Sequence, residues 1–246
     1  MKARKMVTGT VAAFALLAAP AAISTTGAQA ADTDRAAGWS SSFNYNHNGW
    51  SVVSGSWYHD AGRYWRSEGR PDAWNSVRHV NTYRNFVFQS TFKREGNGGG
   101  YYNNSLIVRG RVNRDGDDNW GPAYFFSFAN NGYFSVWKEY GDGSYDPVQD
   151  WTYSSAIDDL IWKKLKVTAV GNRMTFSING RQVWSGYDYS FTAGQVGIGF
   201  YSAAGYWSTM RIDSANLQTL AGKVADDPAA DVGKTVRGGS PTVAPH

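Results

Sequence analysis

The stretch "RMTFSINGRQVWSG", residues 173–186, decides the fold class because it carries the complete signature of a β-hairpin. Apolar and polar residues alternate over "RMTFSI", which is typical of a strand with one buried face. Asn179 and Gly180 then form a pair that readily adopts the positive φ angles of a two-residue type I′ turn. The stretch therefore predicts two antiparallel strands joined by a tight turn.

The same alternation recurs along the chain in short runs bounded by Gly, Asn and Asp. These runs include "FVFQSTF" (86–92), "SLIVRGRV" (105–112), "AYFFSFA" (123–129), "YFSVWKEY" (133–140), "KKLKVTAV" (163–170) and "QVGIGFYS" (195–202). In the first run, Phe86, Phe88 and Phe92 share one face. Only residues 153–164 suit a helical turn. We therefore expect an all-β fold, an antiparallel two-sheet jelly-roll sandwich in a single domain.

The first 30 residues have the three parts of a secretory signal peptide. A basic cluster within the first five residues precedes an apolar run over residues 6–23, and Ala-Gln-Ala at 28–30 supplies a small-x-small cleavage site. A membrane anchor is the alternative, but polar, Gly and Pro residues dilute a run close to the minimum of roughly 18 apolar residues for a span. We expect residues 1–30 to be a signal peptide and the mature protein to be secreted and extracellular.

Composition separates the rest of the chain into three segments. Residues 31–38 are a short lead-in, and residues 39–220 have the steady content of aromatic residues and glycine expected of the β-sandwich domain. Residues 221–246 contain no aromatic residue and no periodic apolar face. Such a segment buries too little apolar surface to offset its conformational entropy, so we expect a disordered tail.

Charge balance and the absence of cysteine exclude several classes of function. The leader holds three of the 24 Lys and Arg and none of the 20 Asp and Glu, so the mature chain has a net charge of about +1. Proteins that bind nucleic acid or an anionic membrane usually carry a strong positive charge, and the nearly neutral mature chain does not. Without cysteine, disulfides, thiol catalysis and thiolate metal sites are excluded. We expect no nucleic-acid partner and no membrane insertion, and no pattern defines an oligomeric state.

Three stretches carry a resemblance to a known fold family: "WKKLKVTAVGNRMTFSINGRQVWSG" (162–186), "FTAGQVGIGFYS" (191–202) and "STMRIDSANLQ" (208–218). Together they resemble the C-terminal half of a concanavalin A-like jelly roll. Bacterial laminin-G-like domains and 3-keto-disaccharide-hydrolase-type domains share this pattern. The stretch "WSVVSGSWYHDAGRYWRSEG" (50–69) and the strands from Phe86 and Leu106 also resemble them, so the resemblance covers residues 39–219. It implies the fold and an extracellular glycan context. The matching residues are turn and core residues, so it implies no particular activity.

Cleavage of a glycan would require catalytic side chains in addition to the residues that define the fold. Glycoside hydrolases use two carboxylates about 5 to 10 Å apart, and the retaining glucanases that this fold resembles carry a Glu-x-Asp-x-x-Glu strand. Here the only glutamates are Glu68, Glu95 and Glu139, and none has an acidic residue two positions away. Asp115 and Asp117 have that spacing but lie in a Gly-containing loop. We assign no catalytic residue, and a glycoside hydrolase remains an alternative.

A polysaccharide lyase is the second enzymatic alternative. It needs a Tyr or His as base and acid and a cation that neutralises a uronate. Tyr102, His79 and Arg109 supply these residue types, but their spacing carries no specificity. Arg109 and Arg111 alternate along a strand, so a solvated outer face is the favoured interpretation of both.

Aromatic residues in polar, Gly-rich stretches are the strongest signal for ligand binding. A flat indole or phenol ring can stack on the apolar face of a pyranose while polar neighbours bind its hydroxyls. The competing interpretation is an aromatic ring folded back on the edge of the sandwich. The candidate carbohydrate-binding residues are Trp65, Trp74, Tyr102, Arg109, Trp120, Tyr145 and Trp207.

One acidic loop is a candidate metal site. Asp115, Asp117 and Asp118 stand around Gly116, and Ca²⁺ prefers six to eight oxygen ligands such as carboxylates. The loop lacks the full Asp-x-Asp-x-Asp-Gly spacing and a downstream Glu, which favours a solvated turn. We assign no cofactor, and Ca²⁺ is the candidate ion.

The expected function is that of a secreted, lectin-like β-sandwich that binds extracellular polysaccharide or cell-surface glycan. A glycan-active enzyme, either hydrolase or lyase, is the alternative if its groups converge only in three dimensions. An adhesion or protein-interaction module is the second alternative, and a flat, groove-free face would favour it.

Overall fold

The computed structural model describes residues 38–69, 71–96, 100–113, 119–157, 161–221 and 240–245. The chain divides into two units, residues 1–35 and 36–246, and only the second contains described residues. The expected signal peptide and nearly all of the lead-in therefore lie outside the described residues. No helix in the described ranges is long and apolar enough to cross a membrane.

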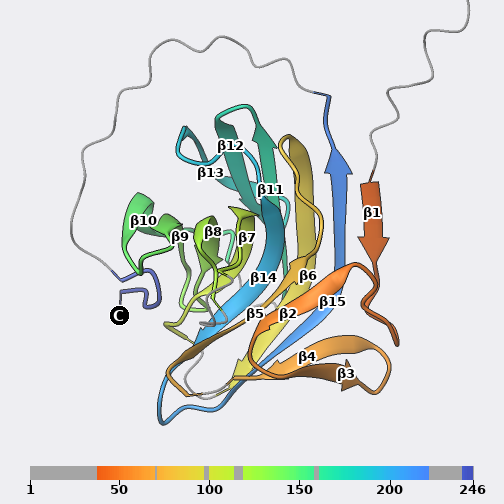
Figure 1. Ribbon diagram of the computed structural model, residues 1–246. Coiled ribbons are helices and arrows are strands. Elements are labelled where there is room, and N and C mark those ends of the chain that lie inside the picture. The colour runs from red at the N-terminus through yellow and green to blue at the C-terminus, as the bar shows by residue number, and fades with distance from the viewer. Residues whose placement is uncertain are drawn as a thin grey trace, which may run out of the picture. The chain divides into compact units, whose positions relative to one another are not determined.

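Two antiparallel sheets form the sandwich (Figure 1). Sheet A has the order β13 (Arg181–Tyr187), β12 (Arg173–Ile178), β11 (Trp162–Val170), β6 (Phe86–Gly96), β15 (Ser208–Thr219), β4 (Tyr64–Glu68) and β3 (Trp57–Asp60), and β1 (Gly38–Ser41) also pairs with β15. Sheet B has the order β10 (Tyr145–Tyr153), β9 (Tyr133–Tyr140), β8 (Pro122–Phe128), β7 (Asn104–Gly110), β14 (Gln195–Ser202), β5 (Ala73–His79) and β2 (Trp50–Ser54). The predicted all-β sandwich is confirmed.

Local sequence accounts for the strand connections. In the hairpin of β12 and β13, Asn179 and Gly180 have φ angles of 50° and 82°, the two positive values expected of a type I′ turn. The expected helical turn within residues 153–164 is wrong where the structure describes them. Residues 154–157 form a turn, and β11 already begins at Trp162.

The main core lies between the two sheets. Phe86, Phe88 and Phe92 of β6 are fully buried there, as their alternation predicts. Phe126 and Phe200 of sheet B belong to the same cluster. Each buried phenylalanine contributes about 1.5–3 kcal/mol to the fold, so a large core takes the place of disulfides.

Sheet B also carries apolar residues that form a second cluster. Ile107, Phe125 and Trp137 belong to this cluster, whereas their chain neighbours Leu106 and Phe126 belong to the core between the sheets. Since successive side chains of a strand point to opposite faces, the second cluster lies on the outer face of sheet B. This outer layer forms the floor of the site described below.

Residues 240–245, called here the 240–245 segment, lie against the sandwich and not in solution (Figure 1, dark blue). Their backbone forms hydrogen bonds with residues 101–103 at 2.7 and 3.0 Å. Trp151 Nε1 donates to the carbonyl oxygen of Ser240 at 2.8 Å, and Asn103 Nδ2 donates to that of Pro241 at 2.6 Å. The sequence predicts a disordered tail, but these six residues are held against the sandwich because its backbone and side-chain donors bind their carbonyl oxygens. Residues 222–239 lie outside the described residues.

Candidate functional site

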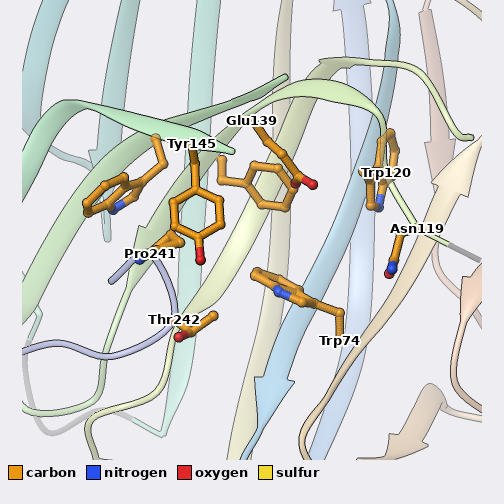
Figure 2. Close-up of a pocket in the computed structure, with 9 residues that line it drawn as sticks. Trp74, Asn119, Trp120, Glu139, Tyr145, Pro241 and Thr242 are labelled. Carbon is orange, nitrogen blue, oxygen red and sulfur yellow. The ribbon is translucent and has the colours of Figure 1, made fainter. Parts of the chain in front are cut away.

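A pocket of about 240 Å³ lies over the outer layer of sheet B (Figure 2). Strands β5, β8, β9 and β10, the loop before β8 and the 240–245 segment all contribute to it. We call it the aromatic pocket, and its lining residues are Trp74, Asn119, Trp120, Phe125, Trp137, Glu139, Tyr145, Pro241 and Thr242.

Strand register brings the floor of the pocket together. Phe125 of β8 is the cross-strand partner of Trp137 of β9, and Tyr145 of β10 is the partner of Glu139. Cross-strand partners have adjacent Cβ atoms, so these four side chains form a continuous surface. Trp74 of β5 reaches the same floor, with its ring centroid 5.2 Å from that of Phe125.

Trp120 forms a fixed wall of the pocket. Its side chain is 4% exposed, and Nε1 donates a hydrogen bond to Ser76 Oγ at 3.1 Å. The ring packs against Gly110 and Gly197, where an added Cβ would come within 2.4 and 2.3 Å of ring atoms. Only glycine at these two positions lets the indole lie so close to the sheet.

Glu139 is the one acidic residue among the described residues that line the pocket. Figure 2 shows its side chain directed into the space between Trp74 and Trp120. Burial, together with the negative charge of Asp142, raises the pKa of Glu139 from 4.5 to about 7. Near neutral pH the side chain is therefore a mixture of carboxylic acid and carboxylate. Within the described ranges, it has no hydrogen-bond or ion-pair partner.

The lining residue Trp137 carries a buried hydrogen-bond donor that is unpaired among the described residues. Trp137 is 1% exposed, and its indole Nε1–H has no hydrogen-bond partner in the described part of the chain. A buried donor without a partner costs about 1–3 kcal/mol. Because Trp137 Nε1 is closed to solvent, Glu139 and not Trp137 is the polar group that the pocket presents to a ligand.

A second pocket, of about 440 Å³, borders the first at Trp120. Arg78, Gly110 and Gln195 help to line it, and the Trp120 ring lies against Gly110. Arg78 donates to Ser51 Oγ at 3.1 Å and to Gln195 Oε1 at 2.9 Å. Trp120 therefore separates an aromatic hollow from a more polar one.

Three predicted binding residues come together in the aromatic pocket, namely Trp74, Trp120 and Tyr145. Trp65 does not, because it is 1% exposed and stacks on Phe43 in the core between the sheets, with ring centroids 5.6 Å apart. Trp65 has polar neighbours in the sequence, which predict a surface loop. It lies on the short strand β4, with its side chain directed into the core. Trp65 is therefore a core residue and unavailable to a ligand.

Arg109 is also a structural residue. The sequence allows two interpretations, a ligand-binding residue or a solvated residue on the outer face of a strand, and the structure supports neither. Its side chain is 1% exposed, and its guanidinium donates to the carbonyl oxygens of Phe191, Arg84 and Gly171 at 3.0, 3.0 and 2.5 Å. The residue has φ 53°, close to an irregularity in the pairing of β7 with β14. A β-bulge interrupts the regular alternation of side chains, so the expected outer-face position is wrong.

The remaining predicted residues lie elsewhere. Tyr102 and Trp207 do not line the aromatic pocket, and Trp207 is 61% exposed before β15. The predicted metal ligands Asp115, Asp117 and Asp118 lie outside the described residues. No group of three His, Cys, Asp or Glu within the described ranges could hold a metal ion.

Sequence reasoning missed several lining residues. Glu139 could have been found, because it alternates with Trp137 along β9 and so shares its face. Phe125 likewise alternates with Ala123. By contrast, no sequence pattern indicates that Pro241 and Thr242 return to the sandwich.

Comparison with known proteins identifies the fold. No protein-family model and no curated protein sequence matches the chain. A carbohydrate-binding module, CBM66 from Bacillus subtilis, is 20% identical, with a TM-score of 0.55 over 71% of this chain and 98% of that one. A Bacillus licheniformis β-glucanase is 13% identical, with a TM-score of 0.55 over 75% and 98%. The carbohydrate recognition domain of Emp47p is 14% identical, with a TM-score of 0.54 over 76% and 98%. The fold is thus a concanavalin A-like jelly roll.

Proposed function

We propose that the protein is a secreted carbohydrate-binding domain that holds polysaccharide or cell-surface glycan in the aromatic pocket without cleaving it. The observation that carries this proposal is the combination, in one pocket, of aromatic faces with the carboxyl group of Glu139, which has no hydrogen-bond partner among the described residues. Secretion is inferred from the pattern of residues 1–30 alone.

The aromatic lining suits the apolar faces of sugar rings. Trp74, Trp120 and Tyr145 surround the pocket on three sides. Rigid aromatic side chains offer a large contact area at a low entropic cost, and Tyr and Trp also carry a polar group. The hydrogen bond that fixes Trp120 means that its wall is formed before a ligand arrives.

The polar group of the pocket suits a hydroxyl. A hydroxyl both donates and accepts a hydrogen bond, so a sugar hydroxyl can donate to Glu139 when it is a carboxylate and accept from it when it is a carboxylic acid. The general ligand class also agrees with the names of the similar structures, which are a carbohydrate-binding module, a carbohydrate recognition domain and a β-glucanase.

A glycan-active enzyme is the second candidate, and the pKa of Glu139 favours it. A carboxyl group with a pKa near 7 in an apolar pocket suits a general acid. Glycoside hydrolysis also requires a second carboxylate about 5 to 10 Å away. Among the described lining residues there is none, which favours binding without cleavage.

The test is a binding and product assay on the chain expressed with its own leader and recovered from outside the cells. The probes are laminarin, mixed-linkage β-glucan, levan, mannan, chitin and mucin. We expect depletion of the protein by at least one glycan and no new reducing or unsaturated ends. Products from any glycan would favour the enzyme, and retention by none would refute the proposal.

A matched pair of variants locates the site. Trp74→Ala removes a lining ring and should weaken binding at least tenfold. Tyr187→Ala removes a 46% exposed ring from β13, which contributes nothing to the pocket, and should bind like the wild type. Equal binding by the Trp74→Ala variant would rule out the aromatic pocket as the site.

A further inference from the structure

A line of aromatic rings continues from the pocket along the surface. Trp74, which lines the pocket, lies 6.5 Å from Tyr201 between ring centroids. Tyr201 lies 5.9 Å from Tyr102, and Tyr102 lies 6.1 Å from Tyr206. We call Tyr102, Tyr201 and Tyr206 the tyrosine cluster. Two of its members come from β14 and the loop that follows it, and Tyr102 precedes β7.

The tyrosine cluster lies at the surface and not in either apolar cluster. Tyr206 is 46% exposed, and Tyr102 and Tyr201 are partly exposed. None of the three belongs to the core between the sheets or to the outer layer. Three adjacent rings at the surface that stabilise no core offer a contact surface for a partner.

Polar contacts hold two members of the tyrosine cluster in place. Arg94 is 5% exposed, and its guanidinium lies 6.0 Å from the ring centroid of Tyr102 and donates to the carbonyl oxygens of Tyr102 and Asn103. Tyr201 Oη donates to Asp72 Oδ1 at 3.2 Å, and the backbone N–H of Ala204 donates to the same oxygen at 2.9 Å. The rings of Tyr102 and Tyr201 are therefore positioned in advance, which reduces the entropy lost on binding, and Tyr206 packs against Tyr102.

We propose that the glycan bound in the aromatic pocket continues past Trp74 onto the tyrosine cluster, so that the ligand class is an oligosaccharide or polysaccharide chain and not a single sugar unit. This inference rests on the proposed function. Successive rings lie 5.9 to 6.5 Å apart, a spacing comparable to one pyranose unit with its linkage. Aromatic rings of this kind can stack on sugar rings, and Tyr206, the most exposed of the three tyrosines, also carries a hydroxyl for hydrogen bonding.

Continuity with the pocket identifies the occupant. Trp74 belongs to both the pocket and the line of rings. Val243, the neighbour of the lining residue Thr242, pairs with Tyr102 in a β-bridge. A chain that leaves the pocket on the Trp74 side therefore meets the tyrosine cluster next.

Chain length is the variable that tests the inference. The probes are laminari-, cello-, chito- and manno-oligosaccharides and levan-type fructo-oligosaccharides of two to six units, titrated by calorimetry against the full chain. For the bound series, we expect the dissociation constant to fall about tenfold from disaccharide to hexasaccharide. The Tyr206→Ala variant should lose about fivefold in affinity for the hexasaccharide and little for the disaccharide.

Controls separate a ligand contact from a folding effect. Tyr206 and Tyr187 are both 46% exposed, so Tyr187→Ala removes a ring of equal exposure away from the line. Neither variant should change the thermal unfolding midpoint appreciably. Tyr206→Phe should retain most of the affinity if stacking dominates.

The outcomes distinguish this inference from the proposed function. A hexasaccharide that binds no better than its disaccharide in every series, or unchanged hexasaccharide binding by Tyr206→Ala, overturns the inference. If Trp74→Ala still abolishes binding to the polysaccharide, the proposed function stands even though the inference about the tyrosine cluster fails. Failure of every glycan to bind refutes both.

Discussion

Replacing Glu139 by glutamine should stabilise the protein at neutral and alkaline pH while weakening glycan binding. The pKa of Glu139 is raised from 4.5 to about 7 by burial and by the charge of Asp142. A raised pKa means that the folded state binds the proton more tightly than the unfolded state. Ionisation therefore destabilises the fold, and the loss accumulates as the pH rises from 4.5 to 7.

The magnitude follows from the pKa difference. Each pKa unit corresponds to about 1.4 kcal/mol, so the difference between 4.5 and about 7 sets an upper limit of about 3 kcal/mol. Water at the mouth of the pocket screens part of this penalty, and we expect Glu139→Gln to gain about 1–3 kcal/mol in unfolding free energy at pH 8. At pH 4 both side chains are neutral, so the gain should disappear.

The assay is urea denaturation of the wild type and of Glu139→Gln at pH 4, 6 and 8. The comparison between the two proteins cancels the titration of groups that they share, such as buried His79, whose pKa is lowered to about 4. The gain should grow from pH 4 to pH 8. A stability difference that is the same at all three pH values would refute the assignment of Glu139 as a buried, uncompensated charge.

Three further perturbations address other parts of the structure. Gly197→Ala places a Cβ 2.3 Å from the Trp120 ring, so it should cost about 1–3 kcal/mol of stability and weaken glycan binding, as measured by denaturation and titration. Arg109→Ala leaves three backbone carbonyls without their donor and should cost about 3 kcal/mol or more, while the fraction that remains folded keeps its glycan affinity. Ending the chain at residue 239 removes Pro241 and Thr242 from the pocket wall. It should weaken binding severalfold and cost about 1–2 kcal/mol, and binding equal to that of the full chain would contradict the role of this wall.

Residues whose environment is local were predictable from the sequence. Asn179 and Gly180 specify their turn through their own backbone preferences, and the phenylalanines of β6 reach the core because a strand alternates faces at every residue. The sandwich follows from such signals, each of which acts over a few residues.

Residues whose role depends on strand register were not predictable in the same way. The positive φ of Arg109 accompanies an irregularity in the pairing of β7 with β14, and no local pattern indicates it. The aromatic pocket combines Trp74, Trp120 and Tyr145 from separate parts of the chain. The residue types alone suggest these three aromatic residues as binding residues. Their position beside Glu139 depends on the pairing of strands, which the sequence does not reveal.

The position of the 240–245 segment has a consequence for how the protein matures. Translation proceeds from the N-terminus, so every described strand of the sandwich, of which β15, ending at Thr219, is the last, is synthesised before this segment. The jelly roll can therefore form while the wall supplied by Pro241 and Thr242 is still missing. A nascent chain would expose a half-open pocket, and full ligand affinity would arise only in a late step of biogenesis.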